Sequence, residues 1–165
     1  MAKKSKAPAA RKKPAPKTRK PTARAKTAKP RRDPLAPTPV MTGKGPGPLE
    51  VGKSLVEMFN RGLFAEIEDT WWDKKKIASV EGHGVGMAWV GLKAVRAKND
   101  GWVAEHAIHG ASAEGPFVGS TGFTVRFKMD VETKATGQRQ VMDEVGVYTV
   151  ENGKIVREEF MYLIP

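Results

Sequence analysis

Asp143, Glu158 and Tyr162 carry the side chains of this sequence that are best suited to proton transfer. They interrupt runs that are otherwise rich in β-branched and aromatic residues, as in strands that face a core. An ionised carboxylate is costly to bury unless it is paired, protonated or beside a cavity. We therefore expect Asp143 to accept a proton, Glu158 to be a second carboxyl with a raised pKa, and Tyr162 to donate a hydrogen bond to a developing oxyanion. The alternative is that both carboxylates are solvated or paired with Arg or Lys.

The Asn-Gly dipeptide at residues 152–153 separates two of these runs and is a strong signal for a two-residue hairpin turn. Such a turn places Glu151 opposite Lys154, and an unbroken antiparallel ladder then pairs Asp143 with Tyr162. The side chains of Asp143 and Tyr162 would then point to the same side of the sheet as Glu158. A bulge in either strand would reverse this arrangement, because successive side chains alternate between the two faces.

Apolar residues at helical spacing predict short helices near residues 51–59 and 64–72 and a third helix over residues 92–106. The expected strands are residues 77–81, 108–118, 122–133, 140–151 and 154–164. In the third of these strands, Phe127 and its alternate neighbours form an apolar face, and charged residues form the other face. The glycine-rich stretch 82–91 lacks the pattern of a phosphate loop and is interpreted as the rim of a pocket. This order predicts an α+β domain in which about three N-terminal helices cover one concave face of a curved antiparallel sheet.

Charge and composition divide the chain into two parts. Residues 1–48 contain 15 Lys or Arg and one acidic residue, Asp33, whereas residues 49–165 contain 14 Lys or Arg and 17 Asp or Glu. Ten of the twelve prolines lie in the first part, and every aromatic residue lies in the second. A segment without aromatic residues and with frequent prolines buries too little apolar surface to offset its conformational entropy. We expect residues 1–48 to be a disordered basic tail and residues 49–165 to form one compact domain.

The tail carries the residues that we expect to contact nucleic acid. Its AKP-, KKP- and RKP-type repeats resemble the basic tails of linker histones and of certain bacterial histone-like proteins. Lys and Arg on an extended chain neutralise phosphates by counterion release, without reading base sequence. The candidate residues are Lys12, Lys13, Lys17, Arg19, Lys20, Arg24, Lys26, Lys29, Arg31 and Arg32. They predict non-specific binding to DNA, RNA or another polyanion, and a solubilising or targeting extension is the alternative.

Composition also excludes several kinds of site. The chain has no Cys, which excludes disulfides, zinc–thiolate sites and Cys nucleophiles. His106 and His109 lie three residues apart without a third ligand, so we expect no metal and no cofactor. No apolar run is long enough to span a membrane, and the N-terminus lacks a secretory signal. We therefore expect no membrane partner and a location in the cytoplasm, nucleoid or nucleus.

Five segments resemble the SnoaL-like domains of the nuclear transport factor 2-like superfamily, which includes polyketide cyclases, ketosteroid isomerase and limonene epoxide hydrolase. These segments are GLKAVRAKNDGW (91–102), EGPF (114–117), FTVRFKMDV (123–131), ATGQR (135–139) and DEVGVYTVENGKIVREEFMY (143–162). The resemblance implies a cone-shaped α+β fold with a pocket between sheet and helices, and commonly a homodimer. It also implies a small, largely apolar ligand and isomerase, cyclase or hydrolase chemistry.

The resemblance extends the set of candidate pocket residues. Ketosteroid isomerase has a carboxylate base near the end of its first strand, which falls at Glu81 or Gly82 here, but its tyrosine on the first helix has no counterpart. Polyketide cyclases use a carboxylate acid/base, sometimes with a His, and Asp143 is the closest match. The additional candidates are Glu81, Trp102, His106, His109, Phe127 and Phe160. The competing hypothesis is a catalytically inert ligand-binding or dimerisation module that the tail attaches to nucleic acid.

Overall fold

The computed structural model describes residues 43–82 and 87–162, so residues 1–42 of the expected tail lie outside the described residues. The helices within these ranges are α1 (Pro48–Asn60), α2 (Phe64–Trp71) and α3 (Leu92–Glu105). The strands are β1 (Ala78–Glu81), β2 (Ala88–Val90), β3 (His106–Val118), β4 (Gly122–Thr133), β5 (Gln138–Glu151) and β6 (Lys154–Tyr162). All three expected helices and all five expected strands are confirmed, with shifts of a few residues at their ends. Among the described helices, none combines the length and apolar character needed to cross a membrane.

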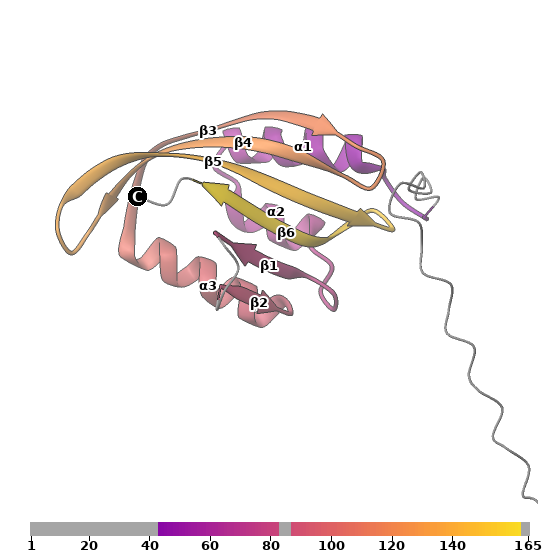
Figure 1. The fold of residues 1–165 in the computed structure, drawn as a ribbon, viewed down its shortest axis with the longest axis horizontal. Helices are drawn as coiled ribbons and strands as arrows, with labels where there is room; N and C mark the ends of the chain where they lie inside the picture. The colour runs from indigo at the N-terminus through magenta and orange to yellow at the C-terminus, as the bar shows by residue number, and fades with distance from the viewer. Residues whose placement is uncertain (1–42, 83–86, 163–165) are drawn as a thin grey trace, which may run out of the picture. The chain divides into compact units, whose positions relative to one another are not determined.

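The six strands form one curved sheet in the order β2-β1-β6-β5-β4-β3 (Figure 1). Neighbouring strands are antiparallel except β1 and β6, which pair in parallel, so the sheet is mixed and the expectation of a wholly antiparallel sheet is wrong. Strand β2 was not predicted, because its three residues are too few for a strand pattern to be recognised within the glycine-rich stretch. The α+β class, with three described helices and a curved sheet, is confirmed, although α3 follows β1 and β2 in the chain.

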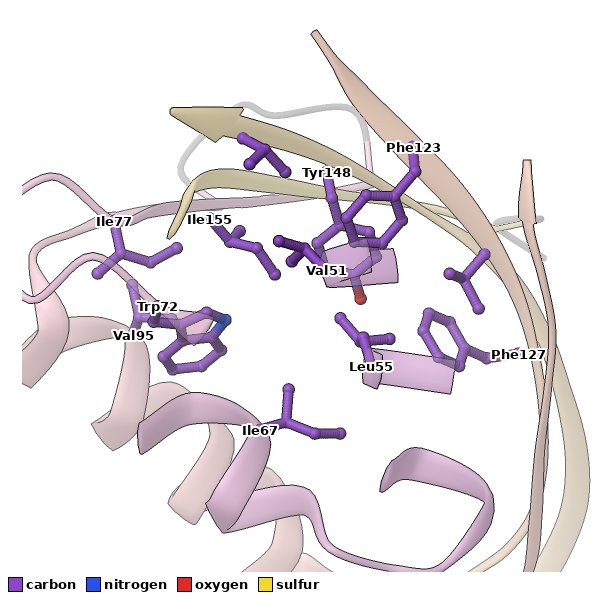
Figure 2. Packing of buried hydrophobic residues seen from close by; sticks show 12 residues of the cluster. Val51, Leu55, Ile67, Trp72, Ile77, Val95, Phe123, Phe127, Tyr148 and Ile155 are labelled. Carbon is purple, nitrogen blue, oxygen red and sulfur yellow. The ribbon is translucent and has the colours of Figure 1, made fainter. Parts of the chain in front are cut away.

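The hydrophobic core lies between the helices and one face of this sheet, which we call the helix-covered face. Val51 and Leu55 lie one turn apart on α1, and both are buried. Phe123 and Phe127 point from β4 toward the helices, where Leu55 lies across from them (Figure 2). The alternation predicted for β4 is therefore correct, and its apolar side is the helix-covered face.

The turn between β5 and β6 has the predicted form. Asn152 and Gly153 have positive φ angles of 50° and 76°, as both central positions of a type I′ turn require. Glu151 and Lys154 close the turn as a facing pair. The sequence therefore determines the geometry of the turn itself.

A bulge follows this turn and displaces the register by one residue. Val150 pairs with Ile155, but Thr149, which is one residue farther from the turn, pairs with Arg157. Val156 is the extra residue, and it has no partner in the ladder. Every pair farther from the turn is shifted accordingly.

The shift exchanges the two faces of β5. Tyr162 pairs with Glu144 and not with Asp143, so the predicted pairing is wrong. The buried side of β5 consists of Glu144, Gly146, Tyr148 and Val150. Asp143 lies on the opposite, outer face of the sheet, because a one-residue displacement moves each side chain to the other side.

Candidate functional site

A cavity of about 1040 Å³ lies between the helices and the helix-covered face of the sheet. Cavities of several hundred Å³ or more enclose most of the surface of a small ligand, and a few polar groups then fix its orientation. The apolar and aromatic part of the wall includes Leu55, Phe59, Phe64, Ile67, Trp72, Trp89, Trp102, Phe127, Tyr148 and Phe160. We call the part of the wall formed by Glu81, Lys98, Glu144 and Glu158 the inner end; these residues come from β1, α3, β5 and β6 respectively.

Lys98 is the centre of a polar network at this inner end. Its Nζ atom donates hydrogen bonds to Glu81 Oε1 at 2.5 Å and to Ser79 Oγ at 3.0 Å. It also lies 4.0 Å from Glu158 Oε1. Two aromatic rings complete its surroundings, those of Trp89 and Phe160, with centroids 5.6 and 5.0 Å from the nitrogen. An ammonium between aromatic faces and carboxylates is well stabilised.

Helical spacing in the sequence gives a signal for Lys98. It lies three residues after the buried Val95 and four before Trp102, so all three side chains lie near one face of α3. A lysine on the apolar face of a helix needs an acidic partner when it is buried. Its partners are in strands β1 and β6, so helical spacing alone does not identify them.

Glu158 is almost completely buried, with 2% of its surface exposed. Burial raises the pKa of this carboxyl to about 7, while Lys98 and a hydrogen bond from Ser79 act in the opposite direction. Its Oε1 atom makes no hydrogen bond to any described residue. The prediction that Glu158 is a carboxyl with a raised pKa agrees with this environment.

Glu144 is the second buried carboxyl of the cavity, and it is not among the residues predicted from the sequence. It is 9% exposed, and burial together with the charge of Glu81 raises its pKa to about 7. It pairs with Phe127 on β4 and with Tyr162 on β6, so it projects from the helix-covered face. No hydrogen bond to its side chain is found among the described residues. Because β5 has valines on both faces, the sequence pattern of this strand does not show which face Glu144 is on.

Two tyrosines lie close to this carboxyl. Burial raises the pKa of Tyr162, and the charges of Glu81 and Glu144 raise it further, so the phenol keeps its proton near neutral pH. Burial also raises the pKa of Tyr148 well above its ordinary value. Gly146 leaves room for this second ring, since a Cβ there would lie 2.9 Å from the Tyr148 hydroxyl.

Asp143 is not part of the cavity, and its predicted position is wrong. Arg126 holds both of its carboxylate oxygens on the outer face, with hydrogen bonds of 2.9 Å from Nε and 2.6 Å from Nη2. The hydrogen bond from Arg126 lowers the pKa of Asp143. A solvated carboxylate with a low pKa is a poor proton acceptor near neutral pH. Asp143 is therefore paired with an Arg, which was the alternative to its role as a proton acceptor.

The other candidates divide into two groups. Glu81, Trp102, Phe127 and Phe160 line the cavity together with Tyr162. The two histidines are not among its described lining residues. His106 stacks on Trp102 with centroids 4.6 Å apart, and His109 lies 2.9 Å from Glu132 at the surface. In the described ranges, no three His, Cys, Asp or Glu side chains form a group that could hold a metal ion.

Comparison with known proteins identifies the family. The SnoaL-like domain model matches residues 48–162, and the chain therefore belongs to this family. A candidate SnoaL-like polyketide cyclase from Mesorhizobium loti, whose name also carries the words carbohydrate phosphatase, is 43% identical over 68% of this chain and 97% of its own, with a TM-score of 0.64.

More distant relatives share the fold. A candidate SnoaL-like polyketide cyclase from Jannaschia sp. CCS1 is 13% identical over 72% of this chain and 90% of its own, with a TM-score of 0.56. A protein with a ketosteroid isomerase-like fold from Catenulispora acidiphila, in complex with trimethylamine, is 9% identical over 70% of this chain and 86% of its own, with a TM-score of 0.56. No curated protein matches the chain.

Proposed function

We propose that this SnoaL-like domain binds a small, largely apolar molecule and exchanges a proton with it through Glu144. The observation that carries the proposal is a carboxyl group with a pKa of about 7 that faces an aromatic cavity without a hydrogen-bond partner among the described residues. A general acid or base is most effective when its pKa lies near the working pH. Glu144 takes the role that the sequence had suggested for its neighbour Asp143.

The surrounding groups have distinct roles in this proposal. Tyr162, across the strand pair from Glu144, donates a hydrogen bond to a polar atom of the ligand. Glu158 and Glu81 hold the ammonium of Lys98 in place, with Glu158 Oε1 4.0 Å from Lys98 Nζ. The aromatic wall supplies affinity through apolar burial.

The names of similar proteins agree with parts of this proposal. Aldol-type cyclisation and double-bond isomerisation, two reactions that the names cyclase and isomerase can cover, transfer a proton to or from carbon, and the relative with trimethylamine holds a small molecule. The words carbohydrate phosphatase in one name fit this cavity less well. A phosphate group would enter a site whose buried titratable groups are mainly carboxyls, and like charges repel.

Solvent deuterium exchange tests the proposal. Small cyclic ketones and cyclic iminium ions would be incubated with the full chain in heavy water and followed by proton NMR. We expect catalysed exchange at the carbon next to the C=O or C=N group, reduced at least about a hundredfold by Glu144→Gln. Asp143→Asn is the matched control, since it makes the same change one residue away on the outer face, and it should leave the rate unchanged.

Two results would lead to different conclusions. Exchange that survives Glu144→Gln would exclude Glu144 as the acid/base. An absence of exchange, together with binding of these compounds detected by tryptophan fluorescence, would favour the non-catalytic module. Trp72, Trp89 and Trp102 line the cavity and serve as reporters.

We also propose that residues 1–48 bind nucleic acid without sequence preference, which would place the protein at the nucleoid or in the nucleus. The support is the charge of this segment, which contains 15 basic residues and only one acidic residue. In gel shifts, the full chain should bind duplex DNA with an affinity that falls with salt by about 0.9 log units per log unit for each phosphate contacted. Replacing ten tail Lys and Arg by Gln should abolish binding, and unaltered binding would exclude the tail as the contact.

A homodimer remains a further proposal for the outer face of the sheet. Val141 on β5 and Met161 on β6 are 71% and 51% exposed there. Light scattering should give twice the monomer mass, and replacing both residues by Lys should shift the mass toward the monomer. A monomeric unsubstituted protein would exclude the dimer.

A further inference from the structure

The charged side chains around the cavity are predominantly acidic. Among the described lining residues, Glu81, Glu144 and Glu158 lie at the inner end, and Glu66, Glu68, Asp100 and Glu105 come from α2 and α3. Lys98 is the single basic residue of the described lining. A cleft lined by charges of one sign with low-dielectric walls concentrates their potential. The cavity therefore favours positive over negative ligands.

The available positive charges already have partners. Lys98 is bound to Glu81 at 2.5 Å, which neutralises one carboxylate of the inner end. Arg96, which is outside the described lining, lies 3.3 Å from Glu68 and neutralises this carboxylate of α2. Glu144 has no such partner among the described residues, although about nine-tenths of its surface is buried and its side chain faces the cavity. A buried carboxylate in this situation needs either a proton or a cation from the ligand.

The walls next to Glu144 are suited to an organic cation. Phe127 faces it across β4 and β5, and Tyr162 faces it across β5 and β6. Tyr148 lies four residues along the same side of β5. Aromatic faces attract an ammonium through the negative potential above the ring, and a carboxylate adds charge pairing. Lys98, between Trp89 and Phe160, shows that this cavity already stabilises an ammonium in the same manner.

We propose that the ligand is a small organic cation, with an amine or iminium nitrogen on a largely apolar body, whose positive charge lies against Glu144. This inference rests on the proposed function, because it names the ligand class of the same cavity. It differs from the oxyanion mechanism expected from the sequence, in which negative charge develops on the ligand.

The sign of the charge also suits the proton transfer. If Glu144 takes a proton from the carbon next to the C=N carbon of an iminium ion, the C–H electron pair becomes the π pair of a new C=C bond and the C=N π pair moves to nitrogen. The ligand changes from +1 to neutral, and the carboxylate becomes a neutral acid. The same step on a neutral ketone would create an anion beside Glu81 and Glu158, where carboxylates repel it.

Three probes of similar size test the charge preference. They are the (3-methoxyphenyl)trimethylammonium cation, its neutral isostere 3-tert-butylanisole, and the 3-methoxybenzoate anion. Binding to the full chain at pH 8 would be measured by calorimetry and tryptophan fluorescence. We expect the cation to bind at least about tenfold more tightly than the neutral isostere, and the anion to bind most weakly.

Substitutions assign this preference to Glu144. Glu144→Gln should reduce the cation-to-neutral affinity ratio to below about threefold without weakening the neutral probe, and Asp143→Asn should retain the full ratio. Equal or tighter binding of the neutral or anionic probe would overturn the inference while leaving cavity binding intact. If no probe binds, both the inference and the proposed function fail. If Glu144→Gln does not fold, the ratio in the unsubstituted protein still decides.

Discussion

Asp143 and Glu144 are consecutive residues with the same functional group, yet they lie in opposite environments on the two faces of β5. On the outer face, Arg126 binds the carboxylate of Asp143 and lowers its pKa. On the helix-covered face, burial raises the pKa of Glu144 to about 7. One carboxyl is fixed as a solvated anion, and the other is poised to gain or lose a proton. The face of the strand, and not the residue type, determines the available chemistry.

The largest expected difference between the faces is in stability. Phe127 is 3% exposed and packs 4.6 Å, centroid to centroid, from Phe59, whereas the next residue, Lys128, is exposed on the outer face. Phe127→Ala should lower the free energy of unfolding by about 3–5 kcal/mol, because it removes a core ring and leaves a cavity. Lys128→Ala should change it by less than about 0.5 kcal/mol. Urea unfolding measures both, and similar losses would contradict the assignment of faces.

Stability should also depend on pH through the helix-covered face. Glu144 and Glu158 have an ordinary pKa of 4.5 that is raised to about 7 in the folded chain. Between these values the folded state holds protons that the unfolded state has released, so stability falls as pH rises from about 4.5 to 7. A tenfold difference in proton affinity between the folded and unfolded states corresponds to about 1.4 kcal/mol, so the loss should reach a few kcal/mol.

Variants separate the contributions to this pH dependence. Urea unfolding at pH 5 and pH 8 should show a smaller difference for Glu144→Gln and for Glu158→Gln than for the unsubstituted chain. Asp143→Asn should leave the difference unchanged, because the lowered pKa of Asp143 adds stability that is lost only at more acidic pH. Stability that rises from pH 5 to pH 8 would contradict the buried state of both glutamates.

The sequence predicted the elements of this fold far better than it predicted the site. Local signals sufficed for the helices, for the type I′ turn and for the alternation around Phe127. The bulge at Val156 has a weaker signal, the adjacent apolar pair Ile155-Val156, both of which are buried. If Ile155 and Val156 are taken to point to opposite faces in a regular strand, the pairing with β6 puts the wrong face of β5 toward the helices. The partners of Lys98 could not be predicted, because they come from strands distant in sequence.

A smaller effect is expected where a glycine leaves space on the helix-covered face. A Cβ at Gly146 would lie 2.9 Å from Phe127 Cε2 and from the ring and hydroxyl of Tyr148. Gly146→Ala should therefore cost about 1–3 kcal/mol through overpacking. Val145→Ala, one residue away on the outer face, should cost less than about 1 kcal/mol. Thermal unfolding of both variants tests the difference, and a neutral Gly146→Ala would show that the rings can move.

The smallest expected effect is at Asp143 itself. Its two hydrogen bonds with Arg126 have good geometry, but the two side chains are 45% and 44% exposed. Exposed ion pairs contribute about 0–1 kcal/mol, because solvent and salt screen the attraction and two flexible side chains must be ordered. Asp143→Asn should thus lower the free energy of unfolding only slightly, and by still less at high salt. A double-mutant cycle with Arg126→Gln, measured at low and high ionic strength, isolates the coupling of the pair. A coupling of several kcal/mol that salt does not reduce would mean that Asp143 is shielded from solvent, and the contrast between the two faces would then fail.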